Sequence, residues 1–88
     1  ASGPIRFIYA GPLVLVAKRG ETEVIRIEAD RVKIHRDGGV YLYRGVNWKA
    51  QGATGKITNA LLQTSEDGKG WILKTVNLKP IAELRFDS

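Results

Sequence analysis

The chain has 88 residues and a formal net charge of +5, with no cysteine and one histidine. This length predicts one domain over residues 1–88, and the lack of cysteine excludes disulfides and thiolate chemistry. A zinc site of His and Cys ligands cannot form around His35 alone, and no carboxylates are spaced as an oxygen ligand set. We therefore expect no metal and no cofactor. No apolar run approaches the roughly 20 residues that cross a bilayer, so we expect no membrane span and a cytoplasmic location.

Short runs of β-favouring residues, separated by Gly, Pro, Asn and Asp, follow one another from the start of the chain. Residues 5–10 form the first run and Gly11-Pro12 ends it. Residues 13–17 are continuously apolar, which predicts a strand covered on both faces. Residues 22–29 alternate, with Ile25, Ile27 and Ala29 on one side. Asp30 marks a break or bulge, and residues 31–36 then alternate again.

The second half of the chain continues this pattern. Residues 39–45 are the partner strand of 31–36, and residues 47–55 are predicted to be a loop. Residues 56–64 fit a strand or two turns of helix, and the strand is favoured because 65–70 then forms a hairpin turn before 71–78. Pro80 restricts the last run to a sheet edge or a strand start. We expect Ala82, Leu84 and Phe86 to face inward.

These elements predict an all-β domain. The expected architecture is a single small antiparallel barrel, roll or sandwich of seven or eight short strands, with at most one short helix near residues 57–64.

The positive charge is concentrated in the centre of the chain. Residues 31–56 contain six Lys and Arg and one acid, whereas the rest of the chain carries eight of each sign. The whole net charge of +5 therefore lies in this segment. Such an asymmetry favours an anionic partner, which can be a nucleic acid, an acidic protein or a lipid surface.

The stretch "KIHRDGGVYLYR", residues 33–44, predicts a hairpin whose turn length decides which side chains share a face. A two-residue turn places Tyr41 and Tyr43 with Val32 and Ile34. A three-residue turn at 37–39, with a left-handed Gly39, pairs Arg36 with Val40, Ile34 with Leu42 and Val32 with Arg44. The tyrosines then lie beside the basic residues. We favour the second register because it separates aliphatic from basic and aromatic side chains.

A basic and aromatic face suits a single-stranded nucleic acid, because cations contact phosphates and flat rings stack on unpaired bases. We therefore predict a small module that binds single-stranded DNA or RNA. Trp48, in a basic segment, either anchors its surroundings or stacks on a base. The predicted nucleic-acid-binding residues are Arg31, Lys33, His35, Tyr41, Tyr43, Arg44, Trp48, Lys49 and Lys56.

Other functions have less support in the sequence. No Ser, Thr or acid is placed to form a catalytic constellation with His35, so we expect a protein that is not an enzyme. The segment "GATGK" lacks the spacing and the hydroxyl residue of a phosphate-binding loop. The alternative hypothesis is a structural or adaptor domain that acts through protein contacts, including a homo-oligomer formed through a sheet edge such as "LVLVA". A binder of anionic lipid surfaces is a third possibility.

Overall fold

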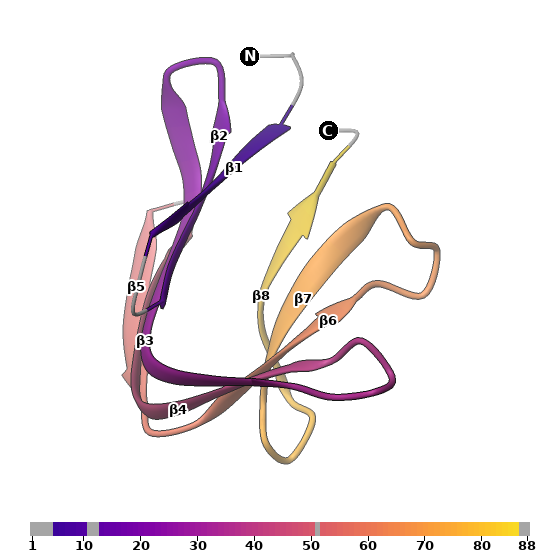
Figure 1. Ribbon diagram of the computed structural model, residues 1–88. Helices are drawn as coiled ribbons and strands as arrows, with labels where there is room; N and C mark the ends of the chain where they lie inside the picture. Colours follow the sequence, from indigo (N-terminus) through magenta and orange to yellow (C-terminus); the bar gives the residue numbers. More distant parts are fainter. Residues whose placement is uncertain (1–4, 11–12, 51, 87–88) are drawn as a thin grey trace.

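The computed structural model describes residues 5–10, 13–50 and 52–86. In these ranges the chain forms strands and turns and no helix, so the predicted all-β class is confirmed, and a strand, as favoured, rather than a helix is present within residues 57–64. Eight strands are present in this part of the chain (Figure 1): β1 (Ile5–Ala10), β2 (Leu13–Arg19), β3 (Thr22–Ile34), β4 (Val40–Ala50), β5 (Ala53–Ile57), β6 (Ala60–Thr64), β7 (Gly70–Thr75) and β8 (Pro80–Arg85).

All eight strands belong to one antiparallel sheet in the order β1-β2-β3-β4-β6-β7-β8, with β5 paired to β4 beside this path. The sheet is folded over into two layers and is not closed (Figure 1). The first layer contains β1, β2, β5 and the adjoining parts of β3 and β4. The second contains β6, β7, β8 and the other ends of β3 and β4. The long β3–β4 hairpin therefore runs through both layers.

The corner between the layers is a local irregularity in this hairpin. Ala29 pairs with Val46 and Arg31 pairs with Tyr43. One residue of β3, Asp30, therefore lies opposite two residues of β4. Arg44 and Gly45 there have positive φ angles of 62° and 99°. Such bulges bend the strand and increase its twist, which explains why the hairpin turns sharply at this point. The break predicted at Asp30 is confirmed as a bulge within a continuous β3.

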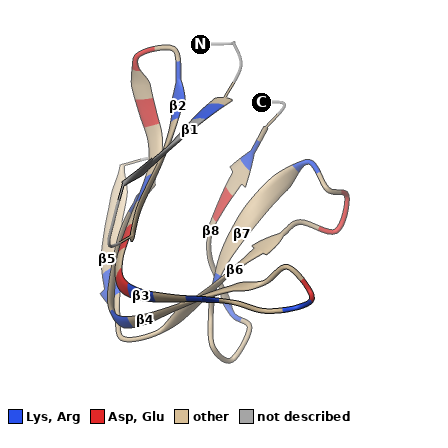
Figure 2. Ribbon diagram, in the orientation of Figure 1, with Lys and Arg blue, Asp and Glu red and all other residues tan. Residues whose placement is uncertain are grey.

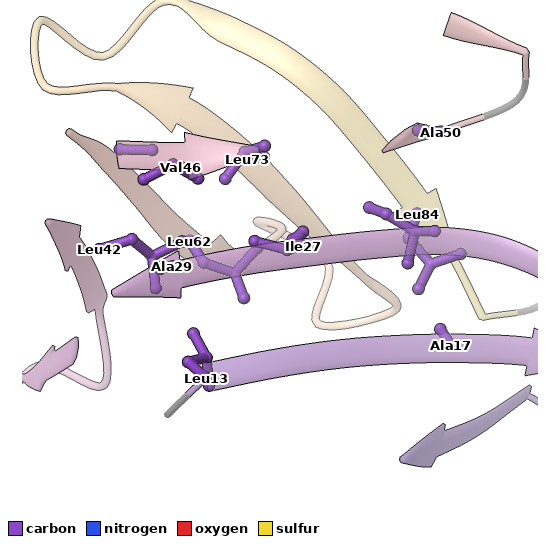
Figure 3. Packing of buried hydrophobic residues seen from close by; sticks show 12 residues of the cluster. Leu13, Ala17, Ile27, Ala29, Leu42, Val46, Ala50, Leu62, Leu73 and Leu84 are labelled. Atoms are coloured by element: carbon purple, nitrogen blue, oxygen red, sulfur yellow. The ribbon is translucent and has the colours of Figure 1, made fainter. Parts of the chain in front are cut away.

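The core lies between the two layers and is built from aliphatic side chains (Figure 3). Ile27 and Val46 contribute from the first layer, and Leu42, Leu62 and Leu73 from the second. Ile25, Ile27 and Ala29 are all buried, as the alternation predicted. Leu84 is buried, and Ala82 and Phe86 pack against the same cluster, so the predicted inward side of the last strand is also confirmed.

Two predictions about the middle of the chain are wrong. Residues 47–55 are not a loop, because β4 continues to Ala50 and pairs through a tight turn with β5 from Ala53. Gly52 in that turn has a φ of 83°, which a glycine adopts without strain. Residues 56–64 are not one continuous strand, because β5 ends at Ile57 and β6 starts at Ala60.

The strand β2, which contains "LVLVA", is not a sheet edge. It pairs with β1 on one side and with β3 on the other. Leu13, Val16 and Ala17 are buried, and Val14 and Leu15 are half-buried. By contrast β8 is an edge strand that starts at Pro80, as expected from the missing amide hydrogen of proline.

The turn between β6 and β7 is held by Asp67. Its Oδ1 accepts hydrogen bonds from the Lys69 amide at 2.9 Å and from the Ser65 hydroxyl at 2.7 Å, and its Oδ2 pairs with Arg85 at 2.8 Å. These interactions hold the pKa of the Asp67 carboxyl well below its ordinary value, the Lys69 amide contributing most. The hydrogen-bonding capacity of this carboxylate is therefore committed to the turn.

Candidate nucleic-acid interface

The hairpin that carries the candidate site has the predicted division of faces but a different register. Ile34 pairs with Val40 and Val32 with Leu42, so the predicted pairings of Arg36 with Val40, Ile34 with Leu42 and Val32 with Arg44 are wrong. The turn begins one residue earlier than predicted, and the left-handed residue is Gly38, with a φ of 88°, rather than Gly39.

The turn has a clear hydrogen-bonding pattern. The Gly38 amide donates to the His35 carbonyl at 3.0 Å, and the His35 amide donates to the Gly39 carbonyl at 2.9 Å. The Asp37 carboxylate accepts from the Gly39 amide at 2.8 Å. Three residues, 36–38, therefore span the turn, as in three-residue hairpins with a bulge at the left-handed position. The register differs from the prediction by two residues, which leaves every side chain on its expected face.

Three rings stand in a row on the outer face of the second layer. The rings of His35 and Tyr41 have centroids 4.0 Å apart, and those of Tyr41 and Tyr43 are 6.3 Å apart and inclined by 25°. All three side chains are half-buried. Leu42, between the two tyrosines in sequence, points the other way into the core. The tyrosine side chains therefore lie on the face opposite the core and are partly exposed.

This aromatic row is bordered by cations on both sides. Cross-strand pairing places Arg31 opposite Tyr43 and Lys33 opposite Tyr41. On the other side Tyr41 lies opposite Leu61, and Leu61 lies opposite Lys74 of β7. A row of paired residues, Lys33, Tyr41, Leu61 and Lys74, thus crosses the four strands β3, β4, β6 and β7 on one face. We call this surface, formed by Arg31, Lys33, His35, Tyr41, Tyr43, Leu61 and Lys74, the tyrosine face.

Leu61 and Lys74 are absent from the predicted site. Leu61 is only 2% exposed although it lies outside the main core cluster, so it forms the apolar base beside Tyr41. The sequence contains a signal for the burial of Leu61. Leu61 is followed by Leu62, and two consecutive apolar residues in a strand indicate that both faces of that strand are covered.

The cations predicted to bind phosphate form no ion pair with the described carboxylates. In the described ranges, ion pairs to carboxylates involve Arg26 and Arg85. None joins the predicted phosphate-binding cations, which are all exposed: Arg31, Lys33, Arg44, Lys49 and Lys56. Figure 2 shows Lys and Arg along the β3–β4 hairpin from the corner towards its tip. These side chains remain available to an anionic ligand.

Trp48 does not join the tyrosines. It lies in β4 opposite Ile27 and Gly55 and packs against the core, half-buried on the inner side of the first layer. A Cβ at Gly55 would come within 2.6 Å of the indole, so the glycine makes room for this ring. Of the two roles considered for Trp48, the arrangement fits the anchor.

The remaining predicted residues lie beyond the tyrosine face. Arg44 is exposed at the corner between the layers. Lys49 and Lys56 lie on the outer face of the first layer, on the paired strands β4 and β5. The structure thus brings five of the nine predicted residues together on the tyrosine face and distributes three others along the same outer surface.

Comparison of the chain with protein-family models, with curated proteins and with solved structures finds no match. Within the described ranges, no helix has the length and hydrophobicity that a membrane span requires. In the same ranges, no group of three or more His, Asp and Glu side chains is arranged to hold a metal ion. The candidate site is therefore interpreted from its own chemistry.

Proposed function

We propose that this chain is a non-enzymatic module that binds single-stranded nucleic acid on the tyrosine face. The observation that carries the proposal is the half-buried row of His35, Tyr41 and Tyr43 between cations that make no ion pair with described carboxylates. Stacking on aromatic rings is tolerant of sequence, since every base has a flat face, and basic side chains follow the phosphates. Arg31, Lys33 and Lys74 supply that charge.

The test is binding of a labelled oligothymidylate, followed by fluorescence anisotropy at several salt concentrations. We expect affinity to fall steeply with salt, as the release of counterions requires. Replacing both tyrosines with leucine (Tyr41→Leu, Tyr43→Leu) removes the rings but keeps apolar cover beside Leu61. Since stacking contributes about 1–3 kcal/mol per base and two rings are removed, the double variant should bind at least about 30-fold more weakly.

The matched control keeps the rings and removes only the hydroxyls. Tyr41→Phe with Tyr43→Phe should bind within about twofold of the unmodified protein, because stacking depends on the ring face. Equal losses in the leucine and phenylalanine variants would show that the rings do not stack. Absence of any binding at low salt would reject the proposed function itself.

The second candidate function is self-assembly through a sheet edge, and one observation favours it. Beyond Ala29, β3 pairs only with β4 among the described residues, so its end in the second layer is a free edge. Val32 and Ile34 are 37% and 74% exposed there. Two copies can pair antiparallel along such an edge. The cations Arg31 and Lys33 on the same edge oppose this pairing, which is why nucleic-acid binding is preferred.

Sedimentation equilibrium distinguishes the two candidates. If the edge assembles, the protein is a dimer at micromolar concentration, and Ile34→Lys converts it to a monomer by adding a charge at the contact. If the edge only carries the cations of the tyrosine face, the unmodified protein and the variant sediment alike as monomers. The latter is the expected result.

A further inference from the structure

The outer face of the first layer has a second group of free cations. Lys49 on β4 and Lys56 on β5 are diagonal neighbours, because Lys49 pairs with Thr54 and Lys56 pairs with Asn47. Such diagonal side chains lie about 7 Å apart on one face of a sheet. Neighbouring Val46 and Ala50 are buried, so Asn47 and Lys49 face away from the core. The two lysines therefore point to solvent together.

Two of the acids near this group, Glu23 and Glu28, are already engaged. Arg26 on the adjacent strand pairs with Glu23 at 2.8 Å and with Glu28 at 3.1 Å. Hydrogen bonding from Arg26 is also the main reason why the pKa of Glu23 is lowered. Lys49 and Lys56 make no ion pair with the described carboxylates. Lys49 also helps to lower the pKa of Glu23, and the charges of Arg26, Lys49 and Lys56 against those of Glu23 and Glu28 leave one net positive charge on this face.

The surface around these lysines is hollowed and continuous with the corner. One depression is lined by Lys49, Lys56, Asn47 and Thr54 together with the paired Arg26 and Glu28. It adjoins a second one lined by Arg44, Asp30 and Gly45, and Asn47 and Glu28 line both. A third, lined by Lys56, Ile57 and Thr58, also includes Asn47. Asn47 is exposed and can both donate and accept hydrogen bonds. A ligand at the corner thus has an open path to the lysines.

Arg44 connects this surface with the tyrosine face. It is exposed at the bend between the layers, where its backbone is left-handed and it precedes the first-layer part of β4. From Tyr41 to Lys49, β4 covers about 25 Å at the rise of an extended strand. At the spacing of one strand of B-DNA, about 3.4 Å per nucleotide, four nucleotides cover about 14 Å and twelve about 40 Å. Only the longer ligand can reach from the tyrosines to the lysines.

We infer that the nucleic-acid surface continues around the corner, and that Lys49 and Lys56 bind the phosphates of a single strand that first stacks on the tyrosine face. This inference rests on the proposed function. It assigns the two layers different roles, since the second layer holds bases and phosphates whereas the first holds phosphates alone. Binding should then strengthen with length until the strand passes Arg44 and reaches the lysines.

The test compares oligothymidylates of about four and about twelve nucleotides, lengths within the range that small ssDNA-binding folds cover. The double variant Lys49→Gln, Lys56→Gln should bind the short strand like the unmodified protein. It should bind the long strand at least about fivefold more weakly. Because each phosphate contact contributes about 0.7 to the salt dependence for single strands, its log–log salt slope for the long strand should fall by about 1.4.

The matched control removes the same charge elsewhere. Lys69 and Lys79 are exposed in the turns before β7 and β8, and Lys69→Gln with Lys79→Gln should leave the binding of both lengths within twofold. If the control weakens long-strand binding as much as the test variant does, net charge alone is responsible and the inference is overturned. It is also overturned if the test variant loses affinity equally for both lengths, or for neither. Failure of the unmodified protein to bind either strand rejects the proposed function, and this inference with it.

Discussion

Replacing Gly70 with alanine is expected to lower the free energy of unfolding by roughly 3 kcal/mol, at the upper end of what overpacking costs. A Cβ at this buried position would lie 2.3 Å from the backbone oxygen of Leu84. The neighbouring backbone cannot move aside easily, because Gly70 pairs with Arg85 and its carbonyl accepts a hydrogen bond from the Ser65 amide at 2.9 Å. Urea unfolding followed by circular dichroism measures the loss.

The control for this substitution is Gly68→Ala in the same hairpin turn. Nothing lies within 4 Å of a Cβ at Gly68, but its φ of 72° is unfavourable for alanine. This strain alone should cost about 1 kcal/mol. Equal losses for the two variants would contradict the close approach of β8 to Gly70.

Truncation of Leu42 is the second substitution expected to have a large effect. Leu42 is 0% exposed and lies in the cluster that joins the two layers. Leu42→Ala removes buried apolar area and leaves a cavity, and such changes cost about 2–5 kcal/mol. In a domain of this size the loss can approach the total stability, so the measurement is a urea titration beginning at low denaturant.

Leu78→Ala provides the same chemical change at a surface position. Leu78 is 57% exposed in the turn between β7 and β8, so truncation there should change stability by less than about 0.5 kcal/mol. A similar loss at both positions would mean that Leu42 does not fill a packed core.

The sequence was sufficient for most of the fold because alternation of two directly reports the buried side of a strand. Ile25, Ile27 and Ala29 were placed correctly for that reason. The region 47–55 was misinterpreted because Gly52 and Gly55 look like loop residues. One of these glycines forms a tight turn, and the other leaves space for Trp48. A glycine required by packing cannot be distinguished in the sequence from one required by a turn.

The alternation of side chains along a strand also explains why part of the candidate site was predicted correctly. The face of Tyr41 and Tyr43 depends only on whether the register is odd or even, so an error of two residues did not affect it. The face on which Trp48 lies could also have been predicted, because continuing the alternation from Leu42 along β4 places Trp48 on the same face as the core residues. The bend at Arg44 could not be predicted from the sequence, because nothing in the sequence marks an arginine that adopts a left-handed backbone conformation.

The bent hairpin also has a consequence for how the molecule unfolds. Because β3 and β4 each pass from one layer into the other, both strands contribute backbone hydrogen bonds to both layers. Neither layer can open along this hairpin without removing strand partners from the other. The corner that divides the outer surface into two faces therefore joins the layers into one cooperative folding unit, in which the deepest amide protons of both exchange only through global unfolding.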